Sequence, residues 1–205
     1  MTHERVAFYF DPACPWTWNT SRWLVEVAQA RGLAVDWRPL SLTVLNAGRE
    51  IPPQYRAPME VGHATLRIVV ALRTAGREGE IGDLYTEVGR RLFYDQEAPS
   101  MALVIGAAEA VGLGAFAAVA TDASYDEAIT ASTREAIQRG GPDVGSPVLV
   151  VGEGPRGFHG PIVSPPPTGD DALRLWDAVT TFSAIPGAFE LKHGRAGGVE
   201  FGPRP

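Results

Sequence analysis

The chain has little cysteine: Cys14 is the only one among 205 residues. A single cysteine excludes an internal disulfide, and the simplest compartment for such a chain is a reducing cytoplasm. It also excludes a two-cysteine redox cycle, because a second thiol is needed to resolve a mixed disulfide within one chain. A disulfide between Cys14 and a small thiol would therefore have to be released by an external thiol.

Long apolar runs and clusters of one charge are also missing. No run of apolar residues approaches the length of about 18 that a transmembrane helix needs, and the first residues lead into a strand-like run rather than a signal peptide. The net charge is -6 and no long basic run occurs. We therefore expect neither a membrane nor a nucleic acid as partner.

Several cofactor signatures are absent as well. The chain has no Gly-rich dinucleotide fingerprint, no phosphate-binding loop and no Gly-x-Ser-x-Gly elbow, so no tightly bound nucleotide is expected. His63 and His159 have no partners at metal-ligand spacing, so no metal is expected; His159 is interpreted as a strand residue that edges the site. Of the 18 basic residues only Lys192 is a lysine, which is typical of a GC-rich bacterial genome.

Apolar residues make up 45% of the chain, enough for a sizeable core in one or two domains. Periodicity predicts a strand over Arg5–Phe10, a helix from Pro15 to about Arg31 that ends at Gly32, and a strand over 33–38. The helix has two faces. Its apolar face is formed by Trp16, Trp23, Leu24, Val27 and Ala28, and its polar face by Asn19, Arg22, Glu26 and Gln29.

The middle of the chain has helical periodicity only. Residues 42–51 are expected to form a loop, and helices are predicted over 53–76, 80–94, 99–111, 113–121 and 124–139. Strands are predicted at 148–151 and 156–160, followed by a helix over about 170–184 and a poorly packed tail after Pro186. We expect an α/β domain in two parts, 1–45 and 143–205, interrupted by a helical insertion at 46–142.

Cys14 is the strongest candidate for chemistry. It follows a strand and a short turn, and Pro15 suits the first position of a helix. The unpaired N–H groups and the dipole at a helix N-terminus favour the thiolate, which is the nucleophilic form of cysteine. The competing interpretation is a small buried hydrophobic residue.

Thr17 and Ser146 are further candidates. Thr17 stands three residues after Cys14, and its hydroxyl either bonds the Cys14 thiolate or bonds the helix backbone. The Ser146–Pro147 pair precedes a strand. It is either an ordinary strand start or a cis-proline loop that faces Cys14 and offers the backbone of Ser146 to a substrate.

Three motifs stand out along the chain: Asp11-Pro12-x-Cys14-Pro15-Trp16, Val144-Gly145-Ser146-Pro147 and Phe158-x-Gly160-Pro161. Further characteristic segments are Ser21-Arg22-Trp23, Ser41-Leu42-x-x-Leu45-Asn46, Gln54-Tyr55-Arg56, Leu175-Trp176-Asp177-Ala178 and Phe189-Glu190-Leu191-Lys192. Together with the helical insertion, these motifs resemble the DsbA-like branch of the thioredoxin superfamily, and most closely the mycothiol-dependent nitroreductase group of actinobacteria.

The resemblance implies a thioredoxin-like fold with an inserted all-helical subdomain, and a cis-proline at Pro147. It implies a cytoplasmic oxidoreductase in which Cys14 works with a low-molecular-weight thiol, mycothiol or a similar one, on a disulfide or a nitroaromatic or quinone-like acceptor. The residues implied in substrate or thiol binding are Pro15, Trp16, Asn46, Tyr55, Ser146 and Pro147. Thr17 departs from the family, which usually has a second cysteine there.

Two alternative functions remain open at this stage. One is a non-redox enzyme similar to kappa-class glutathione transferases and hydroxychromene-carboxylate isomerases, in which the helix N-terminus activates a bound thiol cofactor. The other is a redox-inactive binding module that lost catalysis with its second cysteine. Neither monomer nor homodimer is favoured by the sequence.

Overall fold

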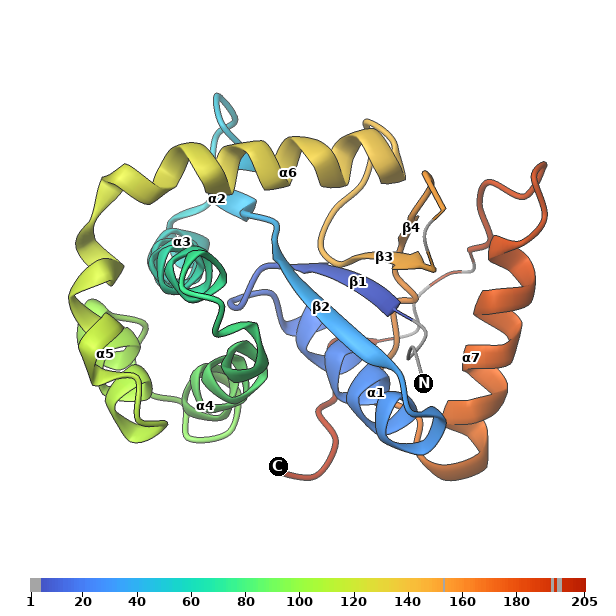
Figure 1. Cartoon of the computed structure of the whole chain (residues 1–205), viewed down its shortest axis with the longest axis horizontal. Helices are drawn as coiled ribbons and strands as arrows, with labels where there is room; N and C mark the ends of the chain where they lie inside the picture. Colours follow the sequence, from blue (N-terminus) through green and yellow to red (C-terminus); the bar gives the residue numbers. More distant parts are fainter. Residues whose placement is uncertain (1–4, 153, 193, 195–196) are drawn as a thin grey trace.

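The centre of the fold is a four-stranded mixed sheet with β1 (Arg5–Phe10) as an inner strand. The computed structural model describes residues 5–152, 154–192, 194 and 197–205. In the order β2–β1–β3–β4, β1 runs parallel to β2 (Ala34–Pro39) and antiparallel to β3 (Val148–Val151), and β4 (Phe158–His159) pairs antiparallel with β3. The predicted thioredoxin-like α/β arrangement is thus confirmed (Figure 1).

One face of the sheet is covered by α1 (Pro15–Arg31) and α7 (Gly169–Ser183). Trp23 of α1 stacks obliquely on Trp176 of α7, with ring centroids 6.1 Å apart. The Trp23 indole also donates a hydrogen bond of 2.9 Å to the carbonyl of Ala172. Because alternate residues of β1 point to this side, Val6, Phe8 and Phe10 join the same apolar core.

Every regular element between β2 and β3 is a helix, as predicted. These elements are α2 (Leu42–Leu45), α3 (Pro53–Thr74), η1 (Glu78–Glu80), α4 (Ile81–Phe93), α5 (Met101–Ala110), η2 (Gly114–Thr121), η3 (Ala123–Tyr125) and α6 (Asp126–Gly140). Figure 1 shows α3, α4 and α5 grouped beside the sheet. The loop expected at 42–51 begins with α2 instead, because the Ser41 hydroxyl accepts the Val44 N–H and caps a short turn.

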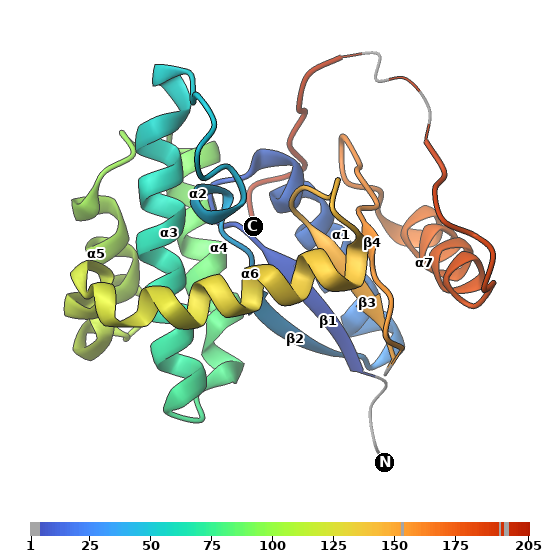
Figure 2. The same ribbon diagram turned by 90° about the horizontal axis from the view of Figure 1, so that it is seen from above.

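The α6 helix connects this group of helices to the second face of the sheet (Figure 2). At its beginning, Asp126 accepts hydrogen bonds from Arg67 of α3 at 2.7 and 2.9 Å and lies 3.0 Å from the His63 imidazole. Further along, Glu135 accepts hydrogen bonds of 3.1 Å from Arg38 of β2. The helix is thus held at two places, one on α3 and one on the sheet.

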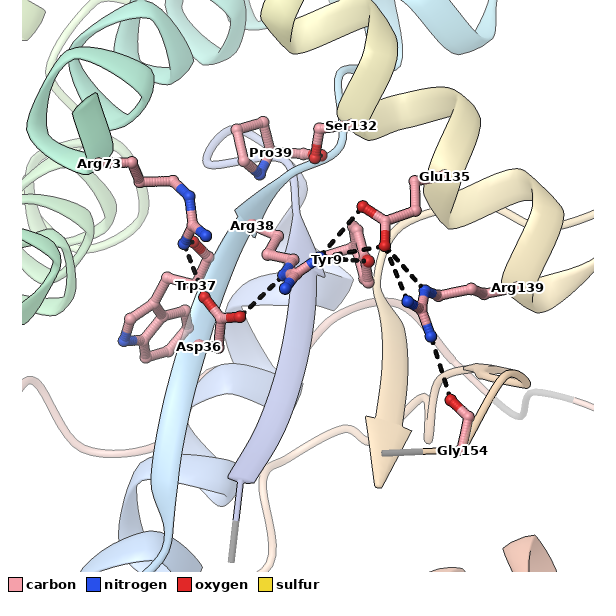
Figure 3. A network of polar contacts seen from close by, with 10 residues as sticks. All are labelled: Tyr9, Asp36, Trp37, Arg38, Pro39, Arg73, Ser132, Glu135, Arg139 and Gly154. Carbon is pink, nitrogen blue, oxygen red and sulfur yellow. Dashed lines mark hydrogen bonds and ion pairs between the residues drawn. The ribbon is translucent and has the colours of Figure 1, made fainter. Parts of the chain in front are cut away.

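A network of ionic contacts surrounds the second of these places (Figure 3). Asp36 of β2 accepts hydrogen bonds from Arg38 at 2.8 Å and from Arg73 of α3 at 2.6 Å. Burial works against the charged carboxylate, but the two guanidinium groups outweigh it and hold the pKa of Asp36 below its usual value. Arg139 of α6 extends the network from Glu135 to the carbonyl of Gly154.

The first part of the polar face predicted for α1 is covered by protein, whereas Gln29 at its far end is exposed. Asn19 is buried and donates to the carbonyls of Val163 and Glu200, at 3.2 and 2.8 Å. Arg22 lies over the Trp18 ring at 4.1 Å. Helical periodicity alone does not reveal that segments distant in sequence cover this part of α1.

The expectation of a poorly packed tail after Pro186 is only partly right. Phe189 and Leu191 are exposed, but Phe201 stacks on Phe93 of α4 with ring centroids 5.2 Å apart. The Tyr94 hydroxyl donates to the carbonyl of Gly202 at 3.1 Å, and Figure 1 shows the chain end near α1 and α4. The chain end is thus anchored by the Phe201 ring together with backbone hydrogen bonds and the Arg204–Asp95 ion pair.

Replacing Gly89 of α4 with alanine should reduce stability. A Cβ at this position would overlap the ring of Trp18, which is fully buried in α1. We expect Gly89→Ala to lower the free energy of unfolding by about 2 kcal/mol in urea denaturation. Gly79→Ala is the control, because a Cβ there meets nothing within 4 Å. Equal losses in the two variants would contradict the close contact of α4 with Trp18.

Candidate functional site

The antiparallel pairing of β1 and β3 brings the two predicted site loops together. Tyr9 pairs with Val148, and two more residues along each strand Asp11 comes opposite Ser146. The Asp11 N–H donates a hydrogen bond of 2.9 Å to the Ser146 hydroxyl. The Ser146–Pro147 peptide bond is cis, as the resemblance implied. Residues from opposite ends of the chain thus share one site.

Cys14 lies where α1 begins, as predicted. It is the N-cap residue, in extended conformation with φ −82° and ψ 114°, and Pro15 follows as the first helical residue. Its side chain is 8% exposed. The Cys14 thiol donates a hydrogen bond to the Ser146 carbonyl, with Sγ and O separated by 3.7 Å. The sulfur therefore faces the cis-proline loop from a nearly closed position.

The pKa of the Cys14 thiol is raised, which corrects the expectation that the helix N-terminus would favour the thiolate. Burial raises it most, and the nearby Asp11 carboxylate adds to the effect. The Thr17 hydroxyl and the N–H groups of Thr17 and Trp16 lower it, but by less. Because the sulfur is buried, the loss of hydration destabilises the thiolate more than the helix N-terminus stabilises it. The protonated thiol is therefore favoured.

Of the two partners weighed for Thr17, the Cys14 sulfur is supported and the helix backbone is not, and the Ser146 hydroxyl is a further partner. Its buried hydroxyl donates a 2.8 Å hydrogen bond to the Ser146 hydroxyl, not to the helix backbone. The same hydroxyl is close enough to Cys14 to lower the pKa of the thiol. A threonine hydroxyl has one hydrogen, so it can serve either Ser146 or an ionised sulfur.

The other predicted binding residues lie on or beside α1, α2 and α3. Trp16 is half-buried in the first turn of α1, whereas Trp18 is fully buried among aromatic residues of the core. Asn46 ends α2 and donates to the Leu42 carbonyl at 2.9 Å. Tyr55 is 56% exposed in the first turn of α3. Among the described residues, no hydrogen bond joins Asn46 or Tyr55 to Cys14.

Residues beside the proline loop include the predicted edge residue His159. Its Nδ1 accepts the Gly145 N–H at 3.4 Å, so this histidine contacts the segment just before Ser146. Two surface hollows lie elsewhere, one between α3 and α6 and one beside α4, and neither has Cys14 or Ser146 in its lining.

Asp11 is a site residue whose role the sequence analysis missed. The side chain is fully buried, and its two carboxylate oxygens accept the N–H groups of Ala13 at 2.9 Å and Leu42 at 2.7 Å. Burial raises the pKa of this carboxyl to about 6, against the effect of the two hydrogen bonds. A signal was present in the sequence, because an acidic residue directly follows an apolar strand. In the structure Gly62 lies inside α3, where a Cβ would overlap the carboxylate.

A second polar group near the site joins Ser41, His63 and Asp126. The Ser41 hydroxyl lies 2.9 Å from His63 Nδ1, and His63 Nε2 lies 3.0 Å from Asp126. This order is that of a hydrolase triad. However, the Ser41 hydroxyl is fully buried and caps α2, so a substrate does not reach it. We assign these residues a structural role in joining α2, α3 and α6.

The residues that the structure describes contain neither a metal-binding cluster nor a membrane-crossing helix. No group of three or more His, Cys, Asp or Glu side chains is arranged to hold a metal ion in this part of the chain. No helix in the described ranges combines the length and apolar character that a membrane crossing requires.

Comparisons with known proteins identify a family and a relative that this chain resembles. The model of the Rv2466c-like family, described as mycothiol-dependent nitroreductase Rv2466c, matches residues 13–193. The uncharacterized protein Rv2286c of Mycobacterium tuberculosis is 28% identical over 192 residues, covering 91% of this chain and 80% of that protein.

Two solved structures show the same fold at low identity. The cytosolic disulfide reductase DsbM of Pseudomonas aeruginosa has a TM-score of 0.58 and 16% identity, covering 86% of this chain and 98% of that one. A 2-hydroxychromene-2-carboxylate isomerase has a TM-score of 0.58 and 18% identity, covering 86% and 94%. At these identities both likenesses concern the fold alone.

Removing the Thr17 hydroxyl should make Cys14 less acidic. In Thr17→Val the shape is kept, but the hydroxyl that lowers the pKa of Cys14 is lost. We expect slower alkylation of Cys14 at neutral pH and a stability loss of about 1 kcal/mol from the missing bond to Ser146.

Thr20→Val is the matched control, because Thr20 is equally buried in α1 and donates to the Pro161 carbonyl at 2.7 Å instead. The measurement is the pH dependence of iodoacetamide alkylation followed by mass spectrometry. An unchanged profile in Thr17→Val, or the same shift in Thr20→Val, would contradict the role of Thr17.

Proposed function

Because the chain belongs to the Rv2466c-like family of mycothiol-dependent nitroreductases, we propose that this thiol-dependent oxidoreductase uses Cys14 as its only nucleophile, with a low-molecular-weight thiol as co-substrate. The observation that carries the proposal is the position of the one sulfur at the beginning of α1, against the Ser146 carbonyl beside cis-Pro147. The family name suggests mycothiol as the thiol.

The first step is ionisation of Cys14. The resting thiol gives its hydrogen bond to the Ser146 carbonyl, and the thiol proton must leave to solvent. The thiolate then gains the N–H groups of Trp16 and Thr17, and the Thr17 hydroxyl turns from Ser146 to the sulfur. These three donors are the groups that already lower the pKa of Cys14.

Thiol–disulfide exchange follows in three steps. The Cys14 thiolate attacks one sulfur of a substrate disulfide, a mixed disulfide forms, and the other sulfur leaves as a thiolate. An external thiolate then attacks the Cys14 sulfur, which releases the second substrate thiolate and leaves a disulfide between Cys14 and the small thiol. A second external thiolate attacks the small-thiol sulfur of that disulfide, forms the oxidised small thiol and releases the Cys14 thiolate. When two external thiols are consumed, they are oxidised to one disulfide, and one substrate disulfide is reduced to two thiols.

Nitroaromatic or quinone-like compounds are the second class of acceptor that we propose. Reduction of a nitro group to a nitroso group takes two electrons and two protons and releases water. Two thiols that join as a disulfide supply these electrons and protons. Such an acceptor therefore has the same thiol stoichiometry as disulfide reduction.

We propose that the substrate binds between the domain formed by 1–45 and 143–205 and the helical insertion at 46–142. The Ser146 backbone and the rings of Pro15 and Pro147 would border the sulfur. The outer residues Trp16, Asn46 and Tyr55 would contact the organic part of the thiol or the acceptor. The exposed Tyr55 ring is free to stack on such a ligand.

Cys14→Ser should abolish the exchange reaction. After exposure to oxidised mycothiol, we expect mass spectrometry to show one thiol adduct on the native chain and none on Cys14→Ser, because no other cysteine exists. Turnover should fall to the uncatalysed rate.

A second variant sharpens this test. Thr17→Cys places a thiol three residues after Cys14, so the adduct should be resolved within the chain and not accumulate. Normal turnover by Cys14→Ser, or the absence of an adduct on the native chain, would contradict the proposal.

Tyr55→Ala should weaken substrate binding. We expect an increase in KM of about fivefold with kcat nearly unchanged, because Tyr55 contacts the substrate but not the reacting sulfur. Met101→Ala is the control, since Met101 is a large exposed apolar side chain at the beginning of α5. An unchanged KM in Tyr55→Ala would exclude Tyr55 from the binding site.

Thiol consumption separates this function from the isomerase-like alternative. An oxidoreductase oxidises two thiols for each two-electron reduction, whereas an isomerase returns its thiol cofactor unchanged. The shared fold does not favour the isomerase, because fold and activity vary independently in this superfamily.

A further inference from the structure

Asp11 contacts every segment that forms the site. Its carboxylate accepts the N–H of Ala13 in the Cys14 turn and the N–H of Leu42 at the beginning of α2. Its own N–H donates to Ser146 in the cis-proline loop. On the fourth side, Gly62 of α3 leaves only enough room for the carboxylate, since a Cβ there would overlap it.

We propose that Asp11 is a positioning residue that holds the Cys14 turn, α2 and the proline loop in one arrangement. In the same position its carboxylate places a negative charge close to the sulfur. This inference extends the proposed function, since it concerns how the nucleophile is controlled. It does not require Asp11 to take a proton from Cys14, because both of its oxygens are already bonded to N–H groups.

No cation among the described residues is bonded to the carboxylate, so the charge of Asp11 acts on Cys14. The described groups that face it are the N–H groups of Ala13 and Leu42, the thiol of Cys14 and the buried phenol of Tyr85 in α4. On α3, His63 follows Gly62 but directs its imidazole to Ser41 and Asp126. A negative charge in this poorly solvated position raises the pKa of Cys14.

A pH-dependent consequence follows from the pKa of Asp11, which burial raises to about 6. Below pH 6 the carboxyl is neutral and Cys14 ionises more easily; above it the carboxylate opposes ionisation. A logarithmic plot of the Cys14 alkylation rate against pH should therefore bend near pH 6 and then rise again.

Two substitutions separate this electrostatic role from a purely structural one. Asp11→Asn removes the charge while keeping an oxygen for the Ala13 N–H. Leu42→Pro keeps the charge and removes the Leu42 N–H, together with the leucine side chain. Proline suits the first position of α2, and Ser41 before it has extended backbone angles, φ −94° and ψ 123°.

The experiment is the pH profile of iodoacetamide alkylation of the full chain, followed by mass spectrometry, with unfolding temperature measured alongside. In Asp11→Asn we expect alkylation at pH 7 to be about threefold faster or more, and the bend near pH 6 to disappear. In Leu42→Pro we expect the bend to remain and move above pH 6, since the Leu42 N–H lowers the pKa of Asp11.

The control is Asp170→Asn, which makes the same charge change at an exposed position of α7. We expect it to leave the native profile unchanged. If Asp11→Asn does not fold, Leu42→Pro still decides, because an unmoved bend in that variant would overturn the proposal. An unchanged profile in a folded Asp11→Asn would also overturn it.

The result is independent of turnover. Alkylation needs neither mycothiol nor an acceptor, so a shifted profile supports the role of Asp11 even if no thiol exchange is found. Conversely, normal exchange by the native chain together with an unmoved profile in both variants would keep the proposed function and reject the role of Asp11.

Discussion

The site depends on the antiparallel pairing of β1 with β3. This pairing is the only reason that a turn at residue 11 meets a loop at residue 146, since 135 residues separate the two along the chain. Register in a sheet is specific, because a slip of one residue turns each side chain to the opposite face. With the observed register, the Ser146 hydroxyl receives the Asp11 N–H and the Ser146 carbonyl receives the Cys14 thiol. The helical segments between β2 and β3 can differ in length without disturbing this contact.

Burial and reactivity oppose one another at Cys14. The helix N-terminus supplies N–H groups that suit a thiolate, but the sulfur is so little exposed that desolvation dominates and its pKa is raised. A substrate that binds beside the sulfur excludes the remaining water from it. The surroundings of the sulfur then consist of fixed groups of the protein and of the substrate. The balance between the Asp11 charge and the Thr17 hydroxyl then decides how easily the thiolate forms. In a chain with one thiol, this balance also limits unwanted oxidation in the resting state.

Much of the fold could be predicted from local patterns, because strands and helices follow hydrophobic periodicity. The position of Cys14 at a helix N-terminus followed from a strand, a turn and Pro15. The burial of Asn19 and the anchoring of Phe201 could not be predicted, since both depend on segments distant in sequence that fold back over α1 and α4. The role of Asp11 was missed for a related reason: its partners are backbone N–H groups, so the sequence signal was limited to an acidic residue directly after an apolar strand.

The two attachments of α6 have a mechanical consequence. Asp126 ties one end of the helix to α3, and Glu135 ties the other half to Arg38 on the sheet. An α-helix resists stretching, so α6 works as a strut that keeps the group of helices at a constant distance from the strands. A hinge-like opening between the group of helices and the sheet would therefore have to break at least one of these two sets of ionic contacts.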